Sequence, residues 1–301
     1  MKNKPLYVET TITCNLDELW AATQDPSRHQ EWDLRFSEID YLPKDDPASP
    51  QQFRYATRMG FGMTVEGKGE SVATKTNNHG VSTSVLKFSS DSLISIIKEG
   101  SGYWKYIPEG KSIRFLTGYD YQTRWGILGS AVDRWIFRPM MRWATAWSFD
   151  CLKNHMEKGI HPRQAITAQV SVLLIHILLG IVWVYQGLVP KLAFPDTGEL
   201  DILRASGVFP GYEETVLLVV GIAEMAFGVG FWWTFKKGIH VLNILGLTFL
   251  AVGALFSDMM VFVQPFNPFA LNISMMGLSI IALLHIDSLP KASNCITNPK
   301  Q

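Results

Sequence analysis

Two titratable side chains interrupt long apolar stretches in the second half of the chain. His176 lies within residues 164–190, which carry no Asp, Glu, Lys or Arg, and Glu224 is the one charged residue of 215–235. An ionised Glu at the centre of a bilayer costs roughly 2.5 kcal/mol or more, so it is expected to face protein and to be paired or protonated. Each residue lies about nine positions into its apolar segment, which predicts a similar depth for both.

These residues support two interpretations. In one, Glu224 and His176 form a proton- or quinone-linked polar site inside a helical bundle, with Asn243 as a third candidate. In the other, Glu224 makes a structural hydrogen bond that fixes how the helices pack. Glycines flank both polar residues at helical spacing, and small residues of this kind allow helices to approach closely.

The first half of the chain offers weaker candidates for chemistry. It contains no HExxH motif, no phosphate-binding glycine loop and no nucleophile elbow. Three cysteines without a CxxC pair argue against a disulfide scaffold, and no metal site and no bound cofactor are expected. The remaining titratable or polar residues show no recognisable pairing by spacing, and no catalytic residue is assigned: His29, Asp33, Arg58, Glu66, Asp120 and Tyr121.

The charges are unevenly distributed along the chain. Lys and Arg balance Asp and Glu at 27 each, which argues against binding of nucleic acid through bulk charge. Forty of these 54 charges lie in the first 165 residues. We therefore expect a soluble domain followed by a membrane-embedded one. The N-terminus lacks the apolar core of a cleavable signal peptide.

Four apolar segments are long enough to cross a bilayer, near 167–189, 215–235, 238–257 and 267–286. Lys and Arg gather before the first, between the second and third, and after the fourth. The positive-inside rule then places both termini in the cytoplasm of a multi-pass protein of the cell membrane. We expect a domain at 1–160, a membrane domain at 161–290 and a short cytoplasmic tail at 291–301.

Two patterns in the membrane half resemble the DoxX-like family. The run from Trp183 to Lys191 (WVYQGLVPK) is similar to the end of that family's first helix, and 221–228 (GIAEMAFG) is similar to its second. The resemblance covers about 125 residues. Related proteins are associated with thiosulfate–quinone redox chemistry, so the resemblance implies quinone as the cofactor of an alternative function.

The first half alternates between strand and turn signals. Residues 6–13 alternate as a strand, and Asn15 offers a helix N-cap with Glu18 three residues later. Strand-like runs follow at 36–42, 52–59, 63–74, 81–88, 94–106 and 111–121, separated by turn clusters. A helical repeat from Ile136 to Cys151 then ends near Gly159.

This order of elements, with the opening from Thr11 to Trp32, resembles the START-like (SRPBCC) superfamily in its polyketide cyclase/dehydrase branch. The resemblance covers residues 4–158 and implies an α+β helix-grip domain whose curved sheet wraps the last helix around an apolar cavity. An all-α bundle of four transmembrane helices follows it. Aromatic residues of the first half are the candidate cavity lining, with ordinary core packing as the alternative for each: Trp20, Trp32, Tyr55, Trp104, Phe115, Tyr119, Trp143 and Trp147.

The segment from Trp125 to Arg138 mixes large apolar residues with arginines. Such a stretch suits the anionic face of a membrane, or else it is a loop that closes the cavity. From the whole sequence we expect an integral membrane protein whose cytoplasmic cavity binds a lipid-like or other hydrophobic small molecule next to the bilayer. The alternative is a DoxX-type redox subunit acting on or with quinone.

Overall fold

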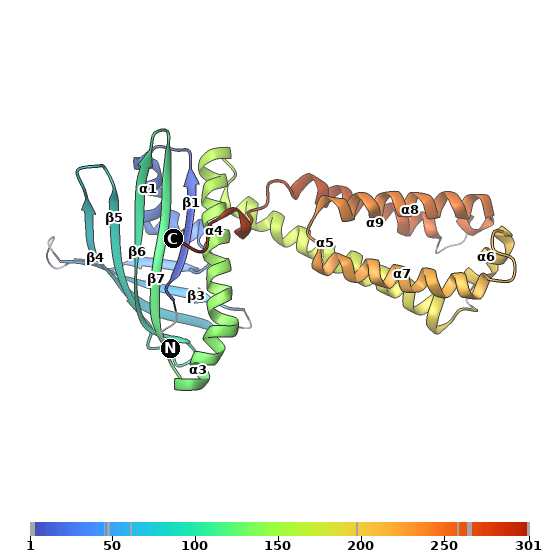
Figure 1. Ribbon diagram of the computed structural model, residues 1–301, viewed down its shortest axis with the longest axis horizontal. Helices are drawn as coiled ribbons and strands as arrows, with labels where there is room; N and C mark the ends of the chain where they lie inside the picture. Colours follow the sequence, from blue (N-terminus) through green and yellow to red (C-terminus); the bar gives the residue numbers. More distant parts are fainter. Residues whose placement is uncertain are drawn as a thin grey trace. The chain divides into compact units, whose positions relative to one another are not determined.

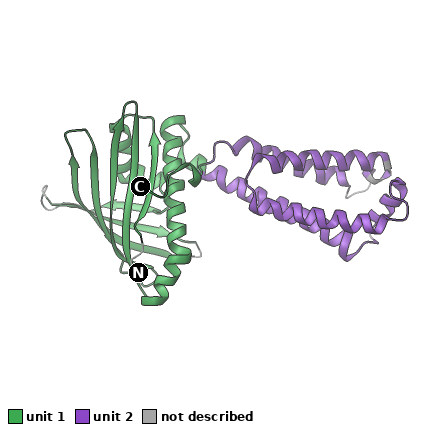
Figure 2. Ribbon diagram, in the orientation of Figure 1, with its two compact units in different colours: residues 1–165, 290–301 green, residues 166–289 purple. Residues whose placement is uncertain are grey.

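The computed structural model describes residues 4–44, 46, 49–60, 62–196, 198–257, 259–263 and 267–299 (Figure 1). It divides into two compact units, shown in different colours in Figure 2. The first unit contains residues 1–165 together with 290–301, and the second contains 166–289. The end of the chain therefore returns to the unit in which it began.

The first unit follows the element order expected from the sequence: one strand, two short helices, six strands and a long helix. A short helix and a π-helical turn precede that last helix. The elements are β1 (Leu6–Ile12), α1 (Leu16–Gln24), α2 (Pro26–Trp32), β2 (Glu38–Tyr41), β3 (Gln51–Arg58), β4 (Thr64–Thr76), β5 (Ser82–Ser89), β6 (Ile97–Glu109), β7 (Ser112–Thr123), α3 (Gly126–Val132), η1 (Asp133–Phe137) and α4 (Arg138–Lys158).

The seven strands form one antiparallel sheet in the order β1-β7-β6-β5-β4-β3-β2, and α4 lies along one face of it (Figure 1). This is the helix-grip arrangement, so the predicted START-like fold of the first unit is confirmed. Buried residues of β1, such as Leu6 and Val8, share this core with Phe149 and Leu152 of α4.

Local sequence sets the ends of the helices. The Asn15 side chain accepts a hydrogen bond from the Asp17 amide at 2.9 Å, which caps α1. Gly159 ends α4 in the left-handed conformation, at φ 68°, where a residue without a Cβ is favoured. The strand expected at 94–106 begins later, at Ile97, because residues 91–96 form a loop.

The last residues of the chain pack on the first unit. Ile296 pairs with Glu9 on the free edge of β1, and buried Asp150 of α4 accepts hydrogen bonds from the Lys291 amide and the Asn294 side chain. Cys295 is buried and its thiol donates to the Ala146 carbonyl. The segment expected to be a simple tail therefore covers a sheet edge that would otherwise be unpaired.

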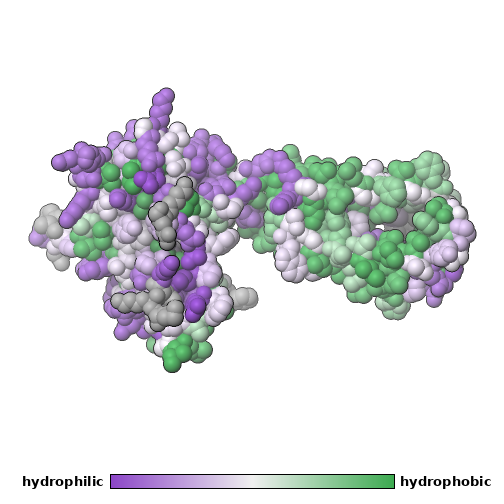
Figure 3. Space-filling model, viewed as in Figure 1, coloured by the Kyte–Doolittle hydropathy of each residue, from purple (hydrophilic) through white to green (hydrophobic). Residues whose placement is uncertain are grey.

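The second unit is built from α5 (Pro162–Leu188), the π-helical turn η2 (Val189–Ala193), α6 (Glu199–Ser206), α7 (Glu213–Trp233), α8 (Lys237–Ser257), the 3-10 turn η3 (Met259–Val263) and α9 (Pro268–His285). Among the described residues, four helices are long and apolar enough to cross a membrane, at 162–193, 213–233, 237–256 and 268–285. Their outward surface is largely apolar (Figure 3), as a lipid-facing surface should be. The predicted four-helix membrane unit is confirmed.

Candidate functional site

The first unit contains a cavity of about 690 Å³. Its lining comes from the strands β2 to β7, from α1, α2 and the segment after α2, from the loop before β6, and from α3, η1 and α4. Most lining side chains are apolar, including Ile39, Val65, Leu86, Ile97 and Met141. A volume of this size lies within the range of 300–1,000 Å³ that is usual for small-molecule sites.

Half of the aromatic residues predicted from the sequence line this cavity: Tyr55, Trp104, Tyr119 and Trp143. The others lie outside the described lining and pack within the unit. Trp20 contacts Tyr106, Phe115 stacks on Phe149 with ring centroids 4.6 Å apart, and Trp32 and Trp147 are almost fully buried. Phe115, Trp32 and Trp147 are therefore core residues and Trp20 is half-buried, because a count of aromatic residues does not show which face of an element each one occupies.

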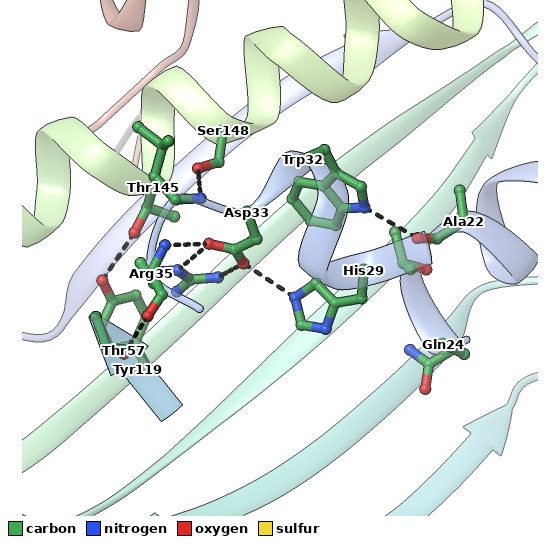
Figure 4. A network of polar contacts seen from close by, with 12 residues as sticks. Ala22, Gln24, His29, Trp32, Asp33, Arg35, Thr57, Tyr119, Thr145 and Ser148 are labelled. Carbon is green, nitrogen blue, oxygen red and sulfur yellow. Dashed lines mark hydrogen bonds and ion pairs between the residues drawn. The ribbon is translucent and has the colours of Figure 1, made fainter. Parts of the chain in front are cut away.

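A buried ion pair lies beside the cavity (Figure 4). Arg35, which contributes to the lining, donates to both oxygens of Asp33, from Nε at 2.8 Å and from Nη2 at 2.5 Å. His29, another lining residue, has its Nε2 3.0 Å from Asp33 Oδ2. The Asp33 side chain is fully buried behind these two groups. The pairing of His29 with Asp33 was missed from sequence, although their four-residue spacing at the end of α2 is a readable signal.

The ion pair is tied to the rest of the cavity wall. The Leu34 amide donates to Ser148 of α4, Thr57 of β3 donates to the Arg35 carbonyl, and the Tyr119 hydroxyl lies 2.9 Å from that of Thr145 (Figure 4). Burial opposes ionisation of Asp33, but Arg35 and His29 outweigh it and hold the pKa of that carboxyl well below its usual range. A histidine paired with a carboxylate can also exchange a proton with a bound molecule.

Because the pKa of Asp33 is lowered on folding, its ion pair stabilises the first unit above the unfolded-state pKa of about 3.9 and loses that contribution as pH falls. We expect the unfolding temperature of the unit to drop as the pH falls below about 4. In Asp33→Asn this part of the pH dependence should disappear, as measured by thermal unfolding of the full chain. Ser148→Ala, which alters the same network without removing a titrating group, should keep the fall in unfolding temperature at low pH. The same dependence of unfolding temperature on pH in the natural chain, in Asp33→Asn and in Ser148→Ala would contradict the role of Asp33.

The polar residues of the second unit form two separate clusters. His176 and His240 lie with their Nε2 atoms 3.0 Å apart, and His176 Nδ1 lies 2.7 Å from the Phe231 carbonyl oxygen. Glu224 instead pairs with Lys191, at 2.9 Å. Phe231 and Glu224 are seven residues apart on α7, which is about 10 Å along the helix. The predicted partnership and shared depth of His176 and Glu224 are therefore wrong; α5 begins at Pro162, so counting from the apolar segment misplaced His176.

The Phe231 carbonyl fixes one donor of the histidine cluster. A carbonyl only accepts, so His176 Nδ1 carries a proton; with neutral imidazoles, His176 Nε2 then accepts from His240, and His240 Nδ1 accepts from Ser279. Ser279 then accepts from Asn243, whose side-chain oxygen accepts from the Trp183 indole at 2.7 Å. This chain of hydrogen bonds links α5, α7, α8 and α9. Asn243, predicted from sequence, thus belongs with His176 and not with Glu224.

The second cluster joins Glu224 to the end of α5. The π-helical turn η2 turns Lys191 inward, where its ammonium lies 2.6 Å from Glu199 and 2.9 Å from Glu224. Lys191 and Glu224 are both buried. The ion pair can form because α5 and α7 pack closely at two glycines. A Cβ on Gly221 would lie 2.8 Å from the Gly187 carbonyl oxygen. The role of Lys191 as the partner of Glu224 was missed from sequence.

The fold and the sites define a membrane protein that joins a START-like cavity domain to a DoxX-like helical bundle. The DoxX-like family model matches residues 180–280, which contain Lys191 and Glu224 and most of the histidine cluster, but not His176. The chain belongs to the family of the uncharacterized membrane protein YndG of Bacillus subtilis, with which it is 46% identical over 188 residues, or 62% of this chain and 70% of the relative.

Solved structures similar to the first unit share little sequence with it. A START superfamily protein from Mycobacterium smegmatis is 12% identical, covers 52% of this chain and 100% of its own, and has a TM-score of 0.38. The Zhui aromatase/cyclase from Streptomyces sp. R1128 is 11% identical over 50% of this chain and 95% of its own, with a TM-score of 0.33. Since both scores are below 0.5, the fold assignment rests on the strand order and the position of α4.

Proposed function

We propose that the first unit binds a lipid-like or other hydrophobic small molecule, and that the membrane unit keeps this binding domain next to the bilayer. The observation that supports the proposal is the cavity of about 690 Å³ with a mostly apolar lining. Apolar surface facing such a space gains free energy, roughly 25 cal/mol per Å², when a hydrophobic molecule covers it. Polar side chains such as His29 and Arg35 supply the few groups that orient a ligand in sites of this kind.

Native mass spectrometry of the full chain, extracted in mild detergent, tests the proposal. We expect a population carrying one hydrophobic molecule that survives removal of loosely bound lipid, because a molecule enclosed in a cavity leaves more slowly than one on the surface. A chain that carries no bound molecule, even at the lowest collision energy that removes the detergent, would contradict the proposal. The alternative of a quinone-linked site in the bundle makes a different prediction: quinone would remain bound after the cavity is filled by mutation.

We propose that both termini, and with them the first unit, lie in the cytoplasm at the cell membrane. A chain that crosses four times has both ends on one side. Basic residues lie at the ends of the spans that face this side. Lys158 and Arg163 lie at the start of α5, and Lys236 and Lys237 lie between α7 and α8. The segment with α6, between the first two spans, carries one basic residue, Arg204, among several acidic ones.

This orientation predicts a clear labelling result. A cysteine introduced at Ser206, at the end of α6, should react with a membrane-impermeant thiol reagent added outside the cell, and a reporter fused after Gln301 should be active in the cytoplasm. The natural cysteines provide the background: Cys151 and Cys295 are buried, and burial raises the pKa of both thiols to about 12. Labelling of Ser206→Cys from the cytoplasm only would reverse the proposed orientation.

A further inference from the structure

Large apolar side chains are exposed together on the first unit, around α3. The isoleucine and leucine of α3 are 91% and 70% exposed, and Trp135 of η1 is 75% exposed. Figure 3 shows apolar residues gathered at the end of the unit where Figure 1 places α3. We call this surface the lip; its members are Leu93, Ile94, Trp125, Ile127, Leu128, Trp135, Ile136, Met140 and Trp143. Soluble surfaces rarely expose such a contiguous group without a partner.

The lip forms the rim of the cavity. Ile94, Trp125, Ile136, Met140 and Trp143 belong both to the exposed group and to the cavity lining. The loop before β6 and the start of α3 are held together, since the Arg124 amide donates to the Ile96 carbonyl at 2.8 Å. An apolar surface therefore runs without interruption from the outside of the unit into the cavity.

The lip is held in a defined conformation. Trp125 adopts a left-handed conformation, with φ 61°, and among the described residues it is the one non-glycine residue with a positive φ. This conformation costs about 1–2 kcal/mol. Beneath the lip, buried Asp133 accepts from the Tyr121 hydroxyl at 2.6 Å and from Arg138 Nε at 2.9 Å. A polar cluster thus fixes the base of η1 while the apolar side chains above it remain exposed.

The charge around the lip indicates what covers it. Residues 124–143 contain four arginines and one aspartate; Arg138 is buried and paired with Asp133, which leaves Arg124, Arg134 and Arg142. Arg134 is exposed, with its guanidinium 5.6 Å from the centre of the Trp135 ring. Tryptophan and aliphatic residues flanked by arginine suit the boundary between acyl chains and anionic headgroups. A protein partner would not require this pairing of aromatic anchors with net positive charge.

We propose that the lip inserts into the anionic lipid surface of the membrane in which the chain is embedded, as a membrane contact separate from the four spans. Trp143, the lip residue nearest to the first span in the chain, lies on α4 about 22 Å along the helix from Lys158, which comes just before that span. The lip is therefore not an extension of the first span. The proposal concerns the surface and holds whether or not the cavity contains a ligand.

The test places a spin label on the lip of the full chain. Leu128→Cys in a Cys14→Ser background is labelled and reconstituted in nanodiscs with 30 mol% phosphatidylglycerol in phosphatidylcholine. Collision rates with oxygen and with a nickel chelate report depth in the bilayer. We expect label 128 to be accessible to oxygen and protected from nickel, and a matched label at exposed Asn78, in the turn between β4 and β5, to show the opposite.

Charge reversal gives the second measurement. Arg134→Glu with Arg142→Glu should move label 128 into water, and nanodiscs of phosphatidylcholine alone should weaken insertion of the unsubstituted lip. Arg124 is left unchanged because it holds the loop before β6. Nickel accessibility at 128 equal to that at 78 would overturn the proposal. Protection from both oxygen and nickel would also overturn it, because it would show that a protein surface covers the lip.

Discussion

Lys191→Met should lower the free energy of unfolding of the membrane unit by about 3 kcal/mol, the lower end of the cost of removing one partner from a buried ion pair. The substitution keeps the length of the side chain but removes its charge. Glu224 is then left buried without its cation, next to a second carboxylate, Glu199. Denaturation of the purified full chain in mixed micelles, followed by the loss of helical circular dichroism, measures the effect.

Two further variants separate the ion pair from other effects of the substitution. Lys191→Met combined with Glu224→Leu should cost less than the sum of the single changes, since the stranded carboxylate is gone. Lys237→Met is the matched control: its pair with Asp287 is exposed, so the change should lie within about 1 kcal/mol. Equal effects of Lys191→Met and Lys237→Met, or additive effects at 191 and 224, would contradict the assignment of Lys191 as the partner of Glu224.

Ser84→Phe should weaken binding of the hydrophobic molecule about tenfold, which corresponds to about 1.4 kcal/mol of binding free energy, and so lower the fraction of chains that carry it. Ser84 lies on β5 and lines the cavity, so a phenyl ring at this position occupies the space of a ligand. The ring enters an existing void, and the unit should therefore remain folded. The bound fraction in native mass spectra and the circular dichroism of the same sample provide the two measurements.

The adjacent residue supplies the control for this substitution. Thr83 is on the same strand, and side chains of neighbouring residues point to opposite faces of a sheet. Thr83→Phe should therefore keep the bound molecule. Leu86→Trp, at the next lining position of β5, should repeat the loss. Equal occupancy in Ser84→Phe and Thr83→Phe would show that the retained molecule lies elsewhere.

The fold of the first unit could be predicted from sequence because its signals are local. Alternation of apolar residues, turn clusters and helix caps act over a few residues, and they gave the element order from β1 to α4. The docking of the last residues on β1 and Asp150 could not be predicted in this way. It depends on a contact between Glu9 and Ile296, which are far apart in the chain, and a single β-bridge leaves no periodic pattern.

The candidate sites could be predicted only in part, since their geometry depends on which face of an element points inward. Aromatic side chains were the natural candidates for the cavity, yet apolar residues such as Leu86 and Ile97 line it as well. In the membrane unit, His176, Asn243 and Glu224 stand out as polar residues in apolar helices. Their partners depended on where α5 begins and on the π-helical turn that brings Lys191 inward, and apolar composition contains neither signal.

Photo-crosslinking from inside the cavity tests the central claim most directly. A compact aliphatic diazirine side chain at position 84 of the full chain, small enough to leave room for a ligand and irradiated in native membranes, should form a covalent adduct with a hydrophobic small molecule that mass spectrometry of the β5 peptide identifies. The same group at position 83, on the opposite face of β5, should not form that adduct. Adducts of the same mass and yield at both positions, or none at position 84, would contradict the claim that this cavity holds a hydrophobic ligand.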